Sequence, residues 1–241
     1  MEISVAAPSP EASDRSAPAA GPLYTILVVA AVAAWAFCFK ILADRLSAAT
    51  HAHRLRFYAL TILLEWLMFA LVVAGVRSSG ASILLVVGER WSSARQVLRD
   101  IGIALGFWIV AIILLRIFAQ LLRATSPGRA LLSMVPHGPA EIAVWIGVSI
   151  SAGICEETIF RGYLQRQFIA FTKNVPAGIA LAAVAFGSAH AYQGLRMVIL
   201  ISLFGAMFGI LAYWRGSVRP GMIAHAWQDS LSGVVAGLIK H

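Results

Sequence analysis

The chain has 241 residues, of which 60% are hydrophobic and only 12% are charged, and its mean hydropathy is +0.82. Soluble proteins of this size carry about a quarter charged residues, because their surface faces water. The composition therefore excludes a free globular enzyme, a nucleic-acid-binding domain and a disordered regulator, and it indicates an integral membrane protein. The basic residues behind the net charge of +8 are scattered between apolar runs, which is typical of loops that face anionic lipid headgroups.

The first 21 residues are rich in Ala, Ser and Pro and have no apolar stretch behind a basic start. This composition matches neither a secretory signal peptide nor a packed element. We therefore predict a disordered tail over 1–21 and a membrane-embedded helical domain over 22–241.

Apolar runs long enough to cross a bilayer follow this tail. A helix needs about 20 residues to span ~30 Å of hydrocarbon at ~1.5 Å per residue. Continuous runs of this length favour a helical bundle over a barrel, whose strands alternate over ~10 residues. We predict an all-α, polytopic bundle with about seven transmembrane helices, at about 22–41, 57–76, 101–122, 140–160, 176–193, 196–214 and 219–239.

Two basic connections bear on the orientation of the bundle. The 40–56 loop carries four Lys or Arg residues, and the 77–100 connection carries four arginines, so the charge bias does not choose a side. A short interfacial or re-entrant piece at about 81–100 would put both connections on one side. We expect the plasma membrane as the location of the chain.

Ionisable side chains inside membrane helices are costly unless they are paired or face a polar cavity, so each one is a functional candidate. The run at 140–160 is the richest, with Glu156 and Glu157 followed closely by Arg161. Glu157 and Arg161 are four residues apart in acid-before-base order, which predicts an ion pair on one helix face. Glu156 points about 100° away and has no partner on its own helix, which suits a general base.

Two histidines, His190 and His225, lie inside predicted spans, and Asp229 shares the helix face of His225. Two histidines and a glutamate can activate a water molecule for hydrolysis. They do so either by holding zinc, here through Glu156, His190 and His225, or by binding the water directly. Both alternatives are open, and other hydrolytic motifs such as His-Glu-x-x-His or Gly-x-Ser-x-Gly are absent from the sequence.

Other residues favour structural interpretations. The two cysteines are too few and too separated for a disulfide framework, so we expect free thiols, and Cys155 is an alternative nucleophile. Glu65 and Arg116 are isolated charges in the second and third predicted spans, and we expect them to pair between these helices. Gly205 and Gly209 form a Gly-x-x-x-Gly pattern, which predicts a close helix-packing surface.

Three ordered motifs resemble those of a known family. They are, in chain order, Glu156-Glu157-x-x-x-Arg161, Phe186-x-x-x-His190 and His225-x-x-x-Asp229. The motifs are similar to those of the CAAX protease and bacteriocin-processing family of intramembrane proteases, which includes the type II CAAX prenyl endopeptidase. The resemblance covers roughly 85–239, which we take as the protease core.

The resemblance implies a role for each motif residue. Glu156 would activate water with His190, His225 would complete the site, Arg161 would order Glu157, Asp229 would help to hold an oxyanion, and Phe160 and Phe186 would line the substrate cavity.

The last motif position departs from the family pattern, which commonly has Asn there. An ionised Asp229 can only accept hydrogen bonds, whereas an Asn donates them. Asp229 is therefore protonated, or it orients His225 or a metal, or another group stabilises the oxyanion.

The motifs together predict an intramembrane endopeptidase that cleaves a membrane-associated or C-terminally lipidated, CAAX-like peptide or protein. Its partners would be this substrate and the lipid bilayer, and no nucleic acid. Two alternatives belong to other classes. One is a non-catalytic bacteriocin-immunity or membrane scaffold protein, and the other is a proton-coupled transporter, although the chain shows no inverted repeat.

Overall fold

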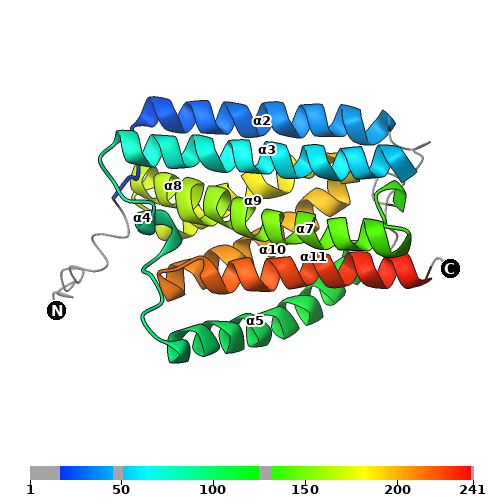
Figure 1. The fold of residues 1–241 in the computed structure, drawn as a ribbon. Coiled ribbons are helices and arrows are strands. Elements are labelled where there is room, and N and C mark those ends of the chain that lie inside the picture. Colours follow the sequence, from blue (N-terminus) through cyan, green and yellow to red (C-terminus); the bar gives the residue numbers. More distant parts are fainter. Residues whose placement is uncertain (1–16, 46–50, 125–131, 240–241) are drawn as a thin grey trace.

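The structure, a computed structural model, describes residues 17–45, 51–124 and 132–239. Every regular element in these ranges is helical, which agrees with the predicted all-α bundle (Figure 1). The elements are α2 (Pro22–Arg45), α3 (His51–Ser78), α4 (Leu84–Val87), α5 (Ala94–Leu121), α7 (Gly138–Glu156), the π-helix η2 (Glu157–Leu164), α8 (Gln165–Thr172), α9 (Val175–Ala189), the 3-10 turn η3 (Ala191–Gln193), α10 (Leu195–Arg215) and α11 (Arg219–Ile239).

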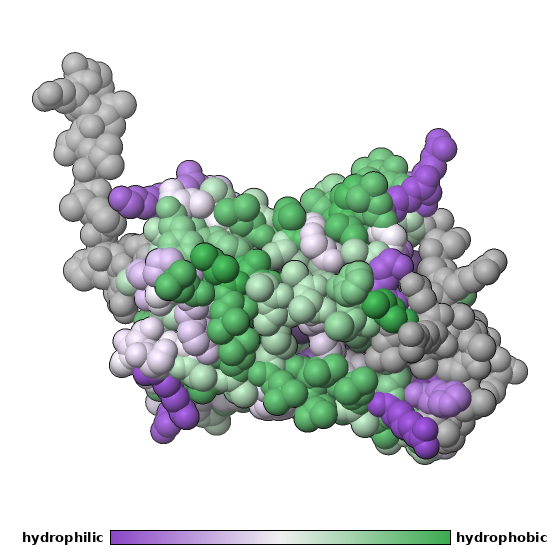
Figure 2. Space-filling view, turned by 90° about the horizontal axis from the view of Figure 1, so that it is seen from above, coloured by the Kyte–Doolittle hydropathy of each residue, from purple (hydrophilic) through white to green (hydrophobic). Residues whose placement is uncertain are grey.

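The described part of the chain contains five helical stretches that are long and apolar enough to cross a membrane. They are Pro22–Ile41, His53–Ser78, Ala94–Leu121, Gly138–Thr172 and Leu195–Arg215. The chain is thus a multi-pass membrane protein, and Figure 2 shows its hydrophobic surface between more hydrophilic ends.

The prediction of about seven spans is not confirmed, because two of the predicted helices fall outside this set. Helix α9 has 15 residues and reaches only about 22 Å, short of the ~30 Å of hydrocarbon. Helix α11 has 21 residues, but its polar side chains, which include His225 and Asp229, lower its hydropathy.

Helices α7, η2 and α8 continue into one another and form the central rod of the bundle, Gly138–Thr172. The rod is longer than the predicted span at 140–160. Helices α3 and α11 pack against α7, whereas α9 packs against α8 (Figure 1). A Cβ on Gly153 would lie 2.7 Å from the carbonyl oxygen of Met222, so glycine allows α11 to approach the rod this closely.

Local signals position the helices around this rod. Asn174 caps α9 by accepting a hydrogen bond from the Ala177 backbone N–H at 2.9 Å. Gly216 adopts φ +62° directly after α10, a left-handed conformation that commonly ends helices. Gly205 and Gly209 confirm the predicted packing surface, since added Cβ atoms would lie 3.1 Å from the Phe186 side chain and 2.5 Å from that of Gln165.

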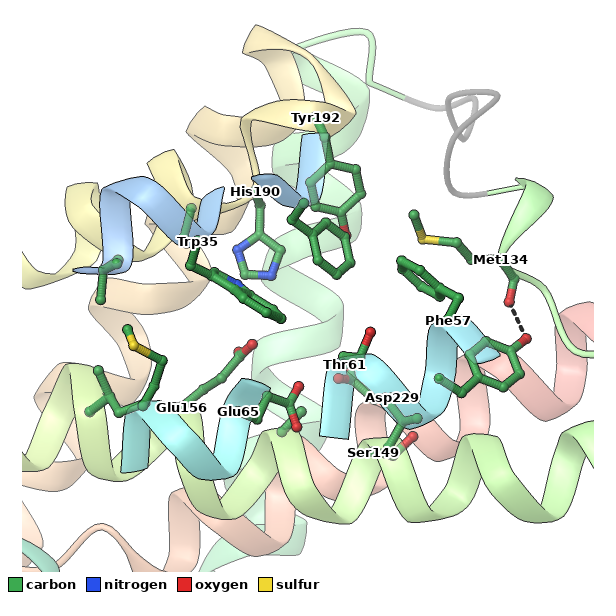
Figure 3. A pocket seen from close by; sticks show the side chains of 18 of the residues that line it. Trp35, Phe57, Thr61, Glu65, Met134, Ser149, Glu156, His190, Tyr192 and Asp229 are labelled. Carbon is green, nitrogen blue, oxygen red and sulfur yellow. Dashed lines mark hydrogen bonds between the residues drawn. The ribbon is translucent and has the colours of Figure 1, made fainter. Parts of the chain in front are cut away.

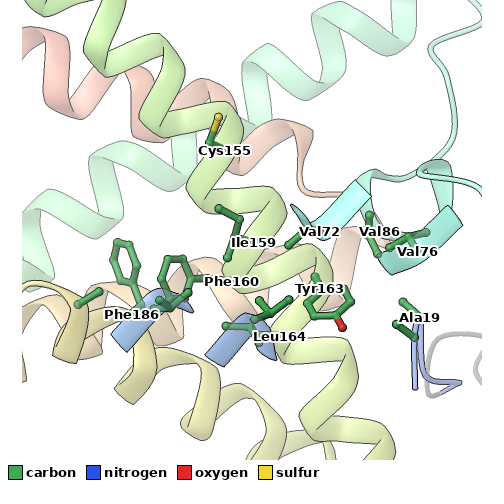
Figure 4. Close-up of a cluster of buried hydrophobic side chains, with 14 residues drawn as sticks. Ala19, Val72, Val76, Val86, Cys155, Ile159, Phe160, Tyr163, Leu164 and Phe186 are labelled. Atoms are coloured by element: carbon green, nitrogen blue, oxygen red, sulfur yellow. The ribbon is translucent and has the colours of Figure 1, made fainter. Parts of the chain in front are cut away.

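The π-helical segment η2 is the least regular part of the rod. Its eight residues are all buried, and it contains both Glu157 and Arg161. It packs against α4 and α9, and the largest apolar cluster of the protein surrounds it, with Tyr163 and Leu164 at its centre (Figure 4). π-Helical turns are rare and frequently coincide with functional sites.

The connection at 81–100 does not form one interfacial piece. Val86 of α4 is buried against the rod, and Arg95, Arg99 and Asp100 belong to the first two turns of α5, which begins at Ala94. Helix α3 runs the length of the bundle, so Arg54 and Arg56 near its start and Arg77 near its end lie at opposite ends of the molecule (Figure 1). The re-entrant arrangement that would put both basic regions on one side is therefore wrong.

The predicted tail is only partly within the described residues, because 1–16 lie outside them. Ala19 and Ala20 are buried, and the side chain of Gln167 holds their backbone. Its amide oxygen accepts from the Ala19 N–H at 2.6 Å, and its Nε2 donates to the Ala20 carbonyl at 2.8 Å. The packed domain thus begins before residue 22.

Candidate active site

A buried ion pair lies at the junction of the rod and α11. Arg161 Nη1 donates to Glu157 Oε1 at 2.9 Å, which confirms the predicted pair. The same oxygen accepts a hydrogen bond from His225 Nδ1 at 2.9 Å. The guanidinium carbon also lies 4.1 Å from the ring centre of Phe186 and 5.3 Å from that of Phe208. Glu157 therefore fixes the orientation of His225, and Arg161 fixes Glu157.

The second ring nitrogen of His225 faces two carboxylates. Nε2 lies 3.7 Å from Glu156 Oε2 and 3.5 Å from Asp229 Oδ2. The His225 side chain is 5% exposed, whereas those of Glu156 and Asp229 are 18% and 36% exposed. Glu156 lacks an ion-pair partner on its own helix, as predicted, but His225 approaches it from α11.

The sequence predicted that His190 lies inside a membrane span. In the structure it is instead the residue that caps the C-terminal end of α9. Its Nδ1 is 2.9 Å from the Phe186 carbonyl oxygen. A carbonyl oxygen only accepts hydrogen bonds, so Nδ1 must carry the proton. In the neutral imidazole Nε2 is then the acceptor, and it is available to bind a hydrogen from water.

The three motifs meet at one cavity of about 130 Å³. Glu156 from α7, His190 from the end of α9 and Asp229 from α11 all line it, as Figure 3 shows. His225 lies behind two of these residues, in contact with both. Most of the remaining lining is aromatic or apolar, and includes Trp35, Phe39, Phe57, Tyr58, Met134 and Trp145.

Only one of the two phenylalanines predicted to line the cavity does so. Phe160 contributes to the wall. Phe186 is 2% exposed and lies behind the wall, with its ring centre 5.1 Å from that of Phe160 and 4.8 Å from that of His190. Phe186 therefore supports the site through Arg161 and His190 and does not face the cavity.

The predicted zinc ligands do not fit a metal ion. Within 17–45, 51–124 and 132–239, no group of three or more His, Cys, Asp or Glu side chains is arranged to hold one. The arrangement of these side chains thus does not support the zinc alternative for Glu156, His190 and His225.

Glu65 does not pair with Arg116, as was predicted, but lines the cavity. Its carboxylate is buried and lines the cavity with Glu156 and Asp229, and Oε2 has no hydrogen-bond partner among the described residues. Arg116, its predicted partner, is exposed on α5. A charge within an apolar run marks Glu65 as a candidate, but the sequence does not predict which side of α3 faces the cavity.

Four hydroxyl groups line the cavity, and those of Tyr58 and Ser149 donate to the backbone carbonyls of Met134 and Trp145. The other two belong to Tyr192 and Thr61. Gln193 Nε2 donates to the Tyr192 hydroxyl oxygen at 2.9 Å, which leaves the phenolic hydrogen for another acceptor. Removal from water raises the pKa of Tyr192, so the phenol stays protonated. The Thr61 hydroxyl is buried and has no hydrogen-bond partner among the described residues.

Cys155 does not support the alternative of a cysteine nucleophile. It is a free thiol, as predicted, but it is fully buried in the apolar cluster around η2 and does not line the cavity. A substrate in the cavity would therefore not reach its sulfur.

Comparison with known families identifies the region that holds these residues. Residues 138–231 match the family described as Type II CAAX prenyl endopeptidase Rce1-like. The match begins at the start of the central rod and includes every motif residue from Glu156 to Asp229, but it is shorter than the core expected at 85–239. No curated protein and no solved structure matches the chain.

Proposed function

Because residues 138–231 form a domain of the Rce1-like family of type II CAAX prenyl endopeptidases, we propose that this chain is an intramembrane endopeptidase. The proposal rests most directly on one observation. Glu156, His190 and Asp229, which come from three helices, line the same cavity inside an apolar bundle. Ionisable side chains inside an apolar bundle are costly, and functional sites are the usual reason for them.

Glu156 is the general base of the proposed reaction. Its carboxylate is accessible from the cavity, and it can take a proton from a water molecule. His190 accepts a hydrogen bond at Nε2 from the hydrogen that the water keeps, because the Nδ1–H donates to the Phe186 carbonyl. The resulting hydroxide attacks the peptide carbonyl, and Glu156 then returns the proton to the leaving amine.

Glu157, Arg161 and His225 act as positioning residues in this scheme. The 2.9 Å contacts of Glu157 with both partners hold the His225 ring, and its Nε2 faces Glu156 and Asp229. The ring of His225 is thereby held against Glu156 and Asp229, the two carboxylates that it approaches in the cavity.

The oxyanion requires a hydrogen-bond donor, and an ionised Asp229 has no hydrogen to donate. The Tyr192 hydroxyl lines the same cavity, and its hydrogen is not used by Gln193. We assign the donor role to Tyr192, which takes the place of the Asn that is common in the family. Asp229 then helps to orient the His225 ring, whose Nε2 lies 3.5 Å from Asp229 Oδ2.

The substrate of the proposed enzyme carries an apolar group. Aromatic side chains such as Trp35, Phe57 and Trp145 surround the catalytic carboxylate and suit an apolar or lipidated segment at a CAAX-like terminus. The cavity of about 130 Å³ is smaller than the roughly 300–1,000 Å³ of ligand pockets, so these side chains must move to admit a peptide.

The test is cleavage of a membrane-peptide library by the purified chain. Glu156→Gln keeps the size of the side chain but removes its basicity, so cleavage should fall by about 10²-fold or more at unchanged thermal stability. Cleavage by Glu156→Gln at the wild-type rate would refute the assigned base.

The variant Glu65→Gln tests which of two carboxylates, Glu65 or Glu156, is the general base, since neither has a partner on its own helix. If Glu65→Gln abolishes cleavage and Glu156→Gln does not, the base is Glu65, which lines the same cavity. If the wild type binds peptides but cleaves none of them, the scaffold alternative replaces the enzyme. Proton flux through proteoliposomes without cleavage would instead identify the transporter.

A further inference from the structure

A second polar cavity of about 410 Å³ lies at the opposite end of the bundle from the start of α7. It is built from the segment that follows α4, the first turns of α5, and the junction between α10 and α11. Its lining is mainly basic, with five arginines and two acidic residues among the described residues: Arg90, Arg99, Arg166, Arg215 and Arg219, and Glu89 and Asp100.

The buried acid of this cavity is already neutralised within the protein. Asp100 accepts from Arg215 Nη2 at 2.9 Å and from Trp91 Nε1 at 2.8 Å. Arg219 Nη2 donates to the Gly88 carbonyl at 2.9 Å, and its guanidinium carbon lies 5.1 Å from the ring centre of Trp91. These contacts hold Arg215 and Arg219 in place in the cavity.

Unused hydrogen-bond donors remain in the cavity. The Nε of Arg215 is buried and has no hydrogen-bond partner in the described part of the chain. Arg90 is exposed at the rim, and the nearest carboxylate oxygen to Arg99 Nε is 3.9 Å away, on Asp100. Guanidinium groups bind anionic oxygens such as those of a phosphate, with two parallel N–H donors for each group.

An apolar groove of about 500 Å³ follows the same two helices away from this cavity. It begins next to the arginines, because Ile103 is one turn after Asp100 on α5 and Trp214 directly precedes Arg215 on α10. Its floor is open, since a Cβ on Gly106 would meet nothing within 4 Å. The groove is lined by Ile103, Gly106, Phe107, Val110, Met207, Ile210, Leu211 and Trp214.

We propose that the cavity and the groove together form a binding site for an anionic phospholipid. The phosphate lies among the arginines at the end of the bundle, and one acyl chain lies in the groove between α5 and α10. The continuity of a basic cavity with an apolar groove matches the order of headgroup and acyl chain in such a lipid. A soluble phosphate would use the cavity but not the groove.

The test measures lipid binding to the purified full-length chain by native mass spectrometry, with phosphatidylglycerol and phosphatidylcholine as probes. The wild type should bind phosphatidylglycerol more tightly. The double substitution Arg90→Gln and Arg99→Gln removes two cavity charges and should weaken this binding roughly thirty-fold. Gly106→Leu places a side chain in the groove, where an added Cβ meets no other atom, and should weaken this binding because the acyl chain loses its packing contacts there.

Matched variants control for charge and for side-chain size. Arg77→Gln with Arg95→Gln removes two exposed arginines of the same region that do not line the cavity. Gly102→Leu adds the same side chain to α5 at another open position outside the groove. Both controls should bind phosphatidylglycerol as the wild type does.

Three outcomes would overturn the proposal. Equal weakening by both arginine pairs indicates general attraction to anionic lipid. Normal binding by Gly106→Leu shows that no acyl chain occupies the groove. Competition by inorganic phosphate at the affinity of the lipid indicates a soluble anion as the ligand. None of these measurements involves proteolysis, so they are independent of the proposed enzyme function.

Discussion

The contact between Glu157, Arg161 and His225 gives the most direct prediction about stability. Arg161→Met keeps most of the apolar bulk of the side chain and removes its charge. Glu157 is then left buried with only His225 as a hydrogen-bond partner at Oε1. We expect a large loss of stability, because a buried carboxylate without its cation is poorly solvated.

The magnitude follows from burial at this site. The Glu157 side chain is 0% exposed and that of Arg161 is 2% exposed, so solvent screening is negligible. Breaking such a pair costs roughly 3–5 kcal/mol, and the lost cation–π contact with Phe186 at 4.1 Å adds about 1 kcal/mol. At roughly 2–4 °C per kcal/mol for a chain of this size, Tm should fall by about 8–24 °C.

The assay is thermal unfolding in detergent, followed by tryptophan fluorescence. Adding Glu157→Gln to Arg161→Met removes the orphaned charge and keeps an acceptor for His225, so Tm should recover most of the loss. The recovered double variant should still cleave slowly, because His225 no longer faces an ionised Glu157. A wild-type Tm for Arg161→Met, or a double variant less stable than either single one, would contradict the argument.

Three further predictions concern single side chains. Tyr192→Phe removes the proposed oxyanion donor, so kcat should fall by about 10²–10³-fold with KM little changed, and an unaltered kcat would reassign the donor. Gly153→Ala should lower Tm, because its Cβ would lie 2.7 Å from a backbone oxygen of α11. The control Gly147→Ala, whose nearest neighbour is a side chain 4.0 Å away, should not, and equal Tm values would contradict the close packing. Cys155→Ala should retain cleavage, since the buried thiol is outside the cavity. A folded but inactive variant would indicate that Cys155 is the nucleophile.

The sequence alone determined the class of fold and the local part of the site. Composition and run length predict a multi-pass helical bundle, because a bilayer requires internal backbone hydrogen bonding. The Glu157–Arg161 pair follows from helix spacing, which needs no knowledge of the rest of the chain. The ordered motifs also indicated that Glu156, His190 and Asp229 belong to one site.

The number of spans and the helix ends were predicted less well. Hydropathy marks where a run is apolar but not where a helix bends, stops short or continues. The rod therefore extends to Thr172 although its second half is more polar, and α9 stops before His190. The sequence also did not predict the π-helical segment, because its backbone hydrogen-bond pattern depends on what packs around it.

Tertiary structure alone decided which side chains share the cavity. His225 reaches Glu156 and Glu157 from a helix almost seventy positions later, and Glu65 turns inward although nothing on its own helix requires it. Helix periodicity relates residues three or four positions apart, whereas such contacts depend on the rotation and crossing of whole helices. The packing of all side chains together sets that rotation, so no short stretch of sequence contains it.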